Sequence, residues 1–202
     1  MKKLFFDIET LPADQDKHEI LKELYAKKKE RGRIKKTLEE FIETTNFGGA
    51  FGRIFCICYA VDDGSTEVLQ GDEKGILKKF WELAQTADLF VGHNILEFDL
   101  KIIWQRSVIL GIKPLIDISF RKFQSAPIFD VMHEWDRWGG NYIAMDDLAR
   151  AMDIPSSKDK LDGSKVHEYF KAGKHQEIID YCKKDVEVVR KIYKRIKFEV
   201  LK

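Results

Sequence analysis

Two acidic residues stand at the end of the first apolar segment, in the sequence LFFDIETLP at positions 4–12. The apolar run predicts a β-strand, on which side chains two positions apart point to the same face. Asp7 and Glu9 would then lie about 7 Å apart along one side of the strand. Carboxylates held close together repel, and burying them is costly unless protons or a cation lie between them. Either this strand end is solvated, or a positively charged group belongs beside it.

Two further acids stand in mainly apolar surroundings. Asp99 lies in VGHNILEFDLKII, where a predicted strand would deliver the start of a predicted helix to an edge of the sheet. Asp185 follows Tyr181 by four residues in YCKKD, and residues four apart share one face of a helix. Each acid also has an ordinary explanation when taken alone, such as a solvated strand end, a helix cap or a surface acid beside a packed tyrosine.

The elements that must position these acids follow from the apolar pattern. A β-hairpin is predicted over RIFCICYAVDDGSTEVLQG, a strand at ADLFVGHN, and a short strand or loop at IFDVMHEW. Helices are predicted over GDEKGILKKFWELAQTA, LEFDLKIIWQRSVILG with an end at Gly111, MDDLARAMDI, SKVHEYFKAG and HQEIIDYCKKDVEVVRKIYKRIKFEVLK. A hairpin followed by alternating strands and helices predicts an α/β fold with a mixed central sheet flanked by helices.

Residues from about 14 to 45 differ in character and look like a helical insertion after the first strand. Apolar residues at helical spacing predict two amphipathic helices joined near Gly32. These apolar residues are Ile20, Leu21, Leu24, Tyr25, Ile34, Leu38, Phe41 and Ile42. Between the two groups lies KKKERGRIKK at positions 27–36, where seven of ten residues are lysine or arginine.

Length and composition limit the class of protein. A chain of 202 residues, 44% of them hydrophobic, fits a single domain over residues 1–202. The net charge of +1 excludes a global basic footprint, so a polyanion would need a local patch. No apolar run approaches the roughly 20 residues of a membrane span, and no secretory signal pattern opens the chain, so a cytoplasmic location is expected. Cys56, Cys58 and Cys182 lack the spacing of a disulfide framework or a four-ligand zinc site, and are expected to be small core residues.

The three acidic motifs together resemble a known family. D-x-E in an N-terminal strand, N-x-x-x-F-D opening a helix and Y-x-x-x-D in a C-terminal helix resemble, in this order, the DEDD superfamily of 3′–5′ exonucleases. Tyr181, with Asp180 rather than histidine five positions before Asp185, is similar to the DEDDy branch. The segments FDIET, HNILEFD, LDGSKV and YCKKDV are similar to stand-alone exonucleases related to the proofreading domain of family B DNA polymerases. The resemblance implies a ribonuclease H-like fold, and the insertion is where the chain resembles the family least.

The resemblance also implies two divalent cations, Mg²⁺ or Mn²⁺, at the four carboxylates. Oxygen ligands without a histidine cluster favour these hard cations over zinc. By resemblance Asp7 would bridge both cations, Glu9 and Asp185 would complete the site that activates the attacking water, and Asp99 would hold the second cation. Tyr181 would orient the water rather than act as a base. The positive group expected beside LFFDIETLP would then be metal.

Other residues are implied to lie near the substrate. Those implied to contact the terminal nucleotide are Thr10, Leu11, Asn94 and Phe98. Thr10 and Leu11 also fit a core or a turn, whereas Phe98 would stack on a base. Asp130 is expected to support the structure, and Lys160 and Lys165 either touch phosphate or lie on a solvated surface.

The expected function is therefore an exonuclease that removes nucleotides from a 3′-hydroxyl end, with single-stranded DNA as the expected substrate. Two alternatives stay open: a 3′–5′ exoribonuclease of the same fold, which motifs do not distinguish, and a catalytically silent nucleic-acid-binding module. Four intact acids with Tyr181 argue against a silent module. The basic run in the insertion is either a solvated helix turn or a patch that holds the nucleic-acid backbone. No motif indicates a protein partner.

Overall fold

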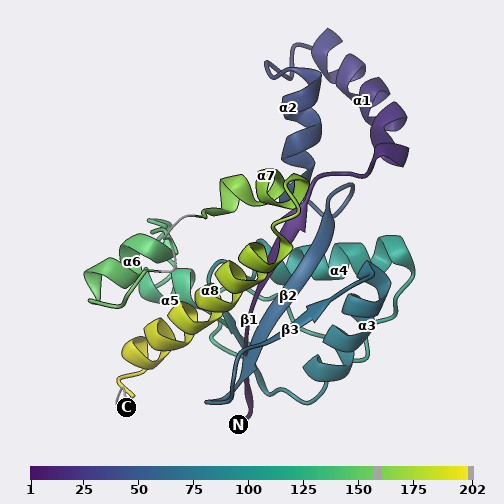
Figure 1. The fold of residues 1–202 in the computed structure, drawn as a ribbon. Helices are drawn as coiled ribbons and strands as arrows, with labels where there is room; N and C mark the ends of the chain where they lie inside the picture. Colours follow the sequence, from purple (N-terminus) through teal and green to yellow (C-terminus); the bar gives the residue numbers. More distant parts are fainter. Residues whose placement is uncertain (157–160, 200–202) are drawn as a thin grey trace.

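A computed structural model describes residues 1–156 and 161–199, and its centre is a five-stranded sheet in the order β3-β2-β1-β4-β5 (Figure 1). The central strand β1 (Lys3–Leu11) pairs antiparallel with β2 (Arg53–Val61) and parallel with β4 (Leu89–Gly92). β3 (Glu67–Gln70) forms the predicted hairpin with β2, and β5 (Ile128–Asp130) runs parallel to β4. The predicted mixed α/β sheet is confirmed.

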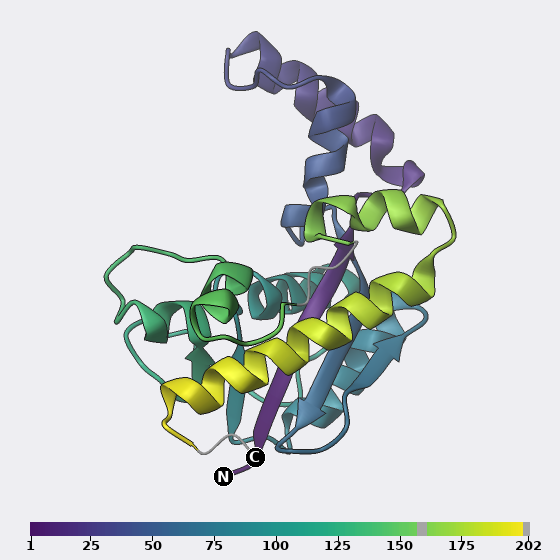
Figure 2. The same cartoon turned by 60° about the vertical axis from the view of Figure 1, so that its left-hand side comes forward.

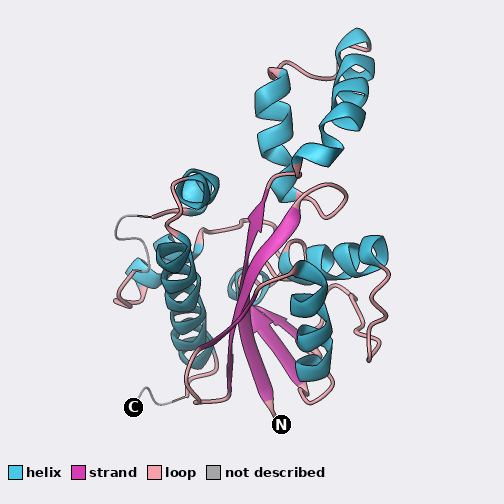
Figure 3. Ribbon diagram, turned by 45° about the vertical axis from the view of Figure 1, so that its right-hand side comes forward, coloured by secondary structure: helices cyan, strands magenta, loops and turns pink. Residues whose placement is uncertain are grey.

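Helices cover both faces of this sheet (Figure 3). α3 (Glu73–Ala84) and α4 (Asp99–Leu110) pack on one face, and the long α8 (His175–Ile196) crosses the other. Gly111 ends α4 in a left-handed conformation at φ 67°, as the sequence predicts. The prediction placed the end of α8 too late. Among residues 197–199, which the structure describes after Ile196, none is buried, and Phe198 is 93% exposed with a positive φ.

The apolar residues of β1 alternate between the two faces, and this alternation decides where the acids point. Leu4, Phe6 and Ile8 pack with α3 and α4, whereas Phe5 packs with α8. Side chains at odd positions of β1 therefore face α8. The first two acids of the chain, at positions 7 and 9, share that side of the strand with Phe5.

Short helices complete the layer that contains α8: α5 (Val131–Trp135), α6 (Met145–Ala151), the 3₁₀ turn η3 (Gly163–Lys165) and α7 (Val166–Lys171). The helix predicted over SKVHEYFKAG is thus split into η3 and α7. None of the helices that the structure describes combines the length and apolar composition needed to cross a lipid bilayer.

The predicted insertion forms a helical hairpin that rises away from the sheet (Figures 1 and 2). Its elements are η1 (Gln15–Lys17), α1 (His18–Glu30), α2 (Leu38–Glu43) and η2 (Thr44–Phe47). Among the helical residues of α1 and α2 only Leu21 is buried, so the hairpin has little core of its own. The basic run 27–36 occupies its outer end, from the last turn of α1 into the connection to α2.

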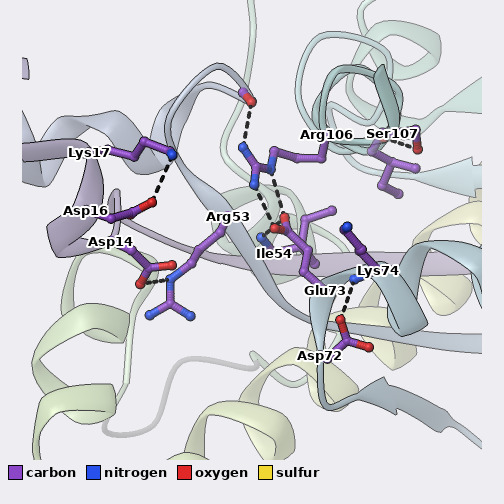
Figure 4. Close-up of polar contacts among 12 residues, drawn as sticks. Asp14, Asp16, Lys17, Arg53, Ile54, Asp72, Glu73, Lys74, Arg106 and Ser107 are labelled. Carbon is purple, nitrogen blue, oxygen red and sulfur yellow. Dashed lines mark hydrogen bonds and ion pairs between the residues drawn. The ribbon is translucent and has the colours of Figure 1, made fainter. Parts of the chain in front are cut away.

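Both ends of the insertion are tied to the body of the protein. The backbone N–H of Ala13 donates to Thr45 Oγ1 at 2.9 Å, and Arg53 Nε lies 2.9 Å from Asp14 Oδ1 (Figure 4). Glu43 pairs with His167 and Lys171 of α7. The residues that follow η2 therefore have a fixed position relative to β1 and α7.

A buried ion pair fixes the return of the chain from the insertion into β2 (Figure 4). Arg106 of α4 donates from Nε and Nη2 to the two carboxylate oxygens of Glu73, at 2.9 and 2.7 Å. Glu73 also accepts from the backbone N–H of Ile54 at 2.7 Å, and Arg106 donates to the Gly49 carbonyl at 3.2 Å. A bidentate pair of this kind holds two helices and a strand in one geometry.

Candidate active site

The candidate site lies where β1 and β4 separate. The two strands pair only over Lys3–Phe5 and Leu89–Val91, while β1 continues to Leu11. On the side that β4 has left, the backbone N–H of Ile8 donates to Asp99 Oδ1 at 3.0 Å. In open α/β sheets, ligands bind in crevices of this kind at the carboxyl ends of parallel strands.

The loop 93–98 is bent tightly so that the first residue of α4 reaches β1. A Cβ atom at Gly92 would lie 1.9 Å from Ile95 Cγ2, so only glycine fits there. Asn94 adopts φ +61°, a left-handed conformation that asparagine tolerates better than most residues. Asp130, at the end of β5, accepts hydrogen bonds from the backbone N–H groups of Asn94 and Leu96 at 2.9 and 3.1 Å. The predicted supporting role of Asp130 is confirmed.

Four carboxylates converge in this crevice from three elements: Asp7 and Glu9 from β1, Asp99 from α4 and Asp185 from α8. Carboxylate oxygens of Asp7 and Glu9 lie within 4.8 Å of each other. Glu9, Asp99 and Asp185 are buried, and Asp7 is half-buried. The fold brings together all four acids that the sequence singles out.

Burial and mutual repulsion perturb the acids strongly. Burial raises the pKa of Asp7 well above its usual value, and the charges of Asp99, Asp185 and Glu9 raise it further. Burial likewise raises the pKa of Glu9, with contributions from Cys56, Asp185 and Asp99. Burial raises the pKa of Asp99 to about 8, against the lowering effect of backbone hydrogen bonds. Such acids resist ionising together, which is typical of a functional site.

Tyr181 lies beside these acids, one turn before Asp185 on α8. Its hydroxyl hydrogen-bonds Asp185, and burial followed by the charges of Asp185, Glu9 and Asp7 raises its pKa far above the usual range. Tyr181 therefore stays protonated at neutral pH. It can donate a hydrogen bond but cannot act as a base.

A cavity of about 360 Å³ opens over Asp7, Glu9 and Asp185, whereas Asp99 is not among its wall residues. Its lining residues are Asp7, Ile8, Glu9, Thr10, Asn46, Phe47, Phe98, Gly163, Ser164, Tyr181 and Asp185. A larger hollow of about 710 Å³ lies elsewhere, against α4 and residues 113–120, and it contains none of the four acids. We place the site at the smaller cavity because the chemically active side chains are there.

The cavity includes two residues that sequence reasoning missed. Asn46 and Phe47 belong to η2, at the end of the insertion, and Phe47 is 66% exposed. Nothing in the local pattern marks them, since only the closed base of the insertion brings them to β1. Gly163 and Ser164 of η3 complete the opposite part of the wall.

Two of the four expected substrate contacts line the cavity, and two do not. Thr10 and Phe98 are wall residues. Leu11 is fully buried with Leu161, Val166, Ile178 and Tyr181, because β1 passes beneath α7 and α8 at this point. Asn94 shapes the loop through its left-handed backbone and does not line the cavity.

The two lysines expected either to touch phosphate or to lie on a solvated surface are not found in the cavity wall among the described residues. Lys165 Nζ lies 3.8 Å from Asp162 Oδ2 in an exposed ion pair and is not among the residues of the cavity wall. Lys160 lies outside the described residues.

Comparisons with known proteins identify the fold and the family. The structure is similar to the family B DNA polymerase from the hyperthermophilic archaeon Pyrobaculum calidifontis, with a TM-score of 0.68 and 16% sequence identity. The match covers 98% of this chain and 24% of the polymerase chain, and it supports the ribonuclease H-like fold that the motifs imply. A comparison with curated proteins gave no significant match.

A family described as predicted 3′–5′ exonucleases related to the exonuclease domain of PolB matches residues 49–199. This segment includes Asp99, Tyr181 and Asp185, whereas Asp7, Glu9 and the helices of the insertion precede it. The chain therefore belongs to the family of predicted 3′–5′ exonucleases related to the exonuclease domain of PolB.

Proposed function

We propose that this chain is one domain that hydrolyses phosphodiester bonds at the 3′-hydroxyl end of single-stranded DNA, with the help of divalent cations. The observation that carries the proposal is the convergence of four carboxylates and a protonated tyrosine in one crevice. Membership of an exonuclease family supports the reaction class. The aromatic residues of the cavity wall support a single-stranded substrate.

The acids fit a pair of hard divalent cations. Their donors are carboxylate oxygens, and two of them, from Asp7 and Glu9, are within 4.8 Å of each other. Mg²⁺ and Mn²⁺ prefer such ligands, and they would offset the repulsion that raises the pKa values of these acids. Asp7, Glu9, Asp99 and Asp185 are the proposed ligands. When bound, the cations would supply activation of the attacking water and stabilisation of the leaving 3′ oxygen.

Tyr181 is proposed to position the attacking water. Its hydroxyl keeps its one proton at neutral pH and donates it to Asp185, so the hydroxyl oxygen is free to accept a hydrogen bond from the water. A fixed acceptor beside the reacting atoms contributes by orientation, because it holds the water in line with the scissile bond.

The cavity wall favours an unpaired terminal nucleotide. Phe47 and Phe98 present aromatic rings beside the acids, and aromatic rings bind single strands by stacking on bases. A base that stacks on protein must leave its own duplex, which favours single-stranded or frayed ends. Thr10 provides a hydroxyl on the same wall.

The reaction is tested with end-labelled oligonucleotides of DNA and RNA. We expect release of nucleotides from the 3′ end of single-stranded DNA with Mg²⁺ or Mn²⁺ and none with chelator. Asp7→Asn should abolish release and reduce the metal-induced rise in melting temperature, since a ligand of the folded state at a hundredfold excess over Kd adds about 2.7 kcal/mol. Faster cleavage of RNA than of DNA would indicate a 3′–5′ exoribonuclease. Binding without cleavage would indicate a catalytically silent nucleic-acid-binding module. Equal metal-induced rises in the melting temperature of the wild type and of Asp7→Asn would contradict the proposed metal site.

Asp99 should make stability depend on pH in chelator. The unfolded carboxyl titrates near pH 4, while the folded one has a pKa of about 8. Between these values the unfolded chain loses a proton that the folded protein keeps, so the free energy of unfolding falls as pH rises. Asp99→Asn removes this pH-dependent loss of stability, and it keeps a side-chain oxygen that can accept the hydrogen bond from Ile8 N–H. Urea unfolding from pH 5 to 8 should show the variant gaining up to about 1.4 kcal/mol per pH unit relative to wild type.

The exposed Asp147 of α6 provides a matched control for the Asp99 measurement. Asp147→Asn should follow the wild-type pH dependence. If Asp99→Asn also runs parallel to wild type, Asp99 ionises normally and the proposed electrostatics of the crevice are wrong.

Tyr181→Phe separates positioning from metal binding. The substitution removes one hydroxyl and no proposed ligand, so turnover should fall by roughly 10²-fold while the metal-induced shift in melting temperature stays unchanged. Tyr142→Phe, at an exposed tyrosine outside the cavity, serves as the control. Wild-type turnover in the Tyr181 variant would remove this residue from the mechanism.

The basic end of the insertion should contact only long substrates. Lys28 and Lys29 lie over the rings of Phe41 and Tyr25 and help to hold the hairpin together, so the test uses residues of the 31–37 connection. α1 has 13 residues, about 20 Å at 1.5 Å per residue. A dinucleotide is shorter than this helix, so it should not reach the outer end of the insertion from the acids.

Glutamine in place of Arg31, Arg33, Lys35 and Lys36 should therefore weaken binding of long single strands and flatten the slope of log affinity against log salt. Three lost phosphate contacts would change the slope by about two units. Dinucleotide cleavage should not change. The control places glutamine at the exposed residues Lys74, Lys78, Lys79 and Lys191. An unchanged slope would mean that the basic run 27–36 is only a solvated surface. Equal losses of activity on long and short substrates would mean that the insertion supports the structure of the site.

A further inference from the structure

Three thiols lie together in the core beside the acids. Cys56 and Cys58 are two positions apart on β2 and point to the same face, and Cys182 on α8 meets them from across that face. All three are free and fully buried, and their Sγ atoms lie within 4.8 Å of one another. The expectation that they are core residues is confirmed, but their spacing in the sequence gives no sign that they meet.

The spacing of the three sulfur atoms suits a thiophilic cation. Zinc–sulfur bonds are about 2.3 Å long, so three thiolates on one ion are about 4 Å apart. The sulfur atoms of this protein lie within 4.8 Å of one another, so small side-chain movements would bring them to that arrangement. Thiolates select zinc and softer ions over Mg²⁺, so this ligand set differs in kind from the carboxylates.

Cys182 connects the thiols with the acids. Its Sγ atom is 3.5 Å from Asp7 Oδ2 and 3.5 Å from the Asp7 carbonyl oxygen. Possible ligand atoms of Asp7, Glu9 and Cys182 also lie within 4.8 Å of one another. Asp7 and Glu9 also line the cavity, so Cys182 lies directly beside the cavity wall.

We propose that Cys56, Cys58 and Cys182 form a separate site for a thiophilic divalent cation, with Zn²⁺ and Cd²⁺ as the ions to test. On binding, three metal–sulfur bonds form and the three thiol protons pass to solvent. Asp7 Oδ2 lies 3.5 Å from Cys182 Sγ but clusters with Cys182 and Glu9 rather than with Cys56 and Cys58, so the Asp7 side chain must turn toward the thiols to supply a fourth ligand. Occupancy therefore withdraws Asp7 from the acids of the cavity. The inhibitory effect rests on the proposed exonuclease function, whereas the binding does not.

The binding is tested by titrating the reduced, folded protein with Cd²⁺ in excess Mg²⁺ and measuring thiolate-to-cadmium charge-transfer absorption in the ultraviolet. The chain has only these three cysteines, so the absorption can come from no other thiol. We expect saturation at one ion per chain. Cys58→Ala and Cys56→Ala should each lower the amplitude and weaken binding at least tenfold, while circular dichroism confirms that each variant is folded. Absence of the absorption in wild type would overturn the proposal and leave the cysteines as packing residues.

The coupling to Asp7 is tested in the same titration and by activity. Asp7→Asn should keep the cadmium absorption but weaken binding, because the thiols remain and one oxygen ligand loses its charge. If the protein cleaves DNA, Zn²⁺ should inhibit the wild type. Cys58→Ala should have wild-type activity in the absence of Zn²⁺ and should need at least tenfold more Zn²⁺ for the same inhibition. Equal inhibition of both proteins would overturn the coupling. If no nucleic acid is cleaved, the absorption alone still decides whether the site exists.

Discussion

Carboxylates that share a buried crevice repel one another. The strands and helices around the crevice must therefore hold the four acids in place against this repulsion. β1 places Asp7 and Glu9 on the side of the sheet that α8 covers, together with the apolar Phe5. α8 returns Asp185 to the same side, and Asp99 reaches the edge of β1 through a backbone hydrogen bond. Three rigid elements thus hold charges that would otherwise move apart, which preorganises the crevice for cations.

The supports of this crevice are themselves polar and buried. Asp130 accepts hydrogen bonds from two backbone N–H groups of the loop before α4, so the position of that loop does not depend on side-chain packing alone. On the far side, Arg106 and Glu73 join α4 to α3 and to the start of β2. Removing one partner of such a pair leaves a buried charge, which is strongly destabilising. The site therefore depends on polar contacts well outside the cavity.

Much of the fold could be predicted from the sequence because its signals are local. Alternation in LFFDIE places two acids on one face, and the spacing of Tyr181 and Asp185 places both on one turn of α8. Contacts between distant segments could not be predicted, because periodicity carries no information on which faces meet. Asn46 and Phe47 reach the cavity only through the closed base of the insertion, and Leu11 is buried because β1 runs beneath α7.

The base of the insertion has a consequence for how members of this family could diversify. The chain leaves β1 and returns toward β2 at points joined by the hydrogen bond from Ala13 to Thr45, with Arg53 bound to Asp14 beside it. We therefore expect changes in the length of the hairpin beyond this closure to leave the acids, Asn46 and Phe47 in place. If the proposed function holds, the hairpin is a spacer whose length and charge could change how much of a strand is held without changing the site where the strand is cut.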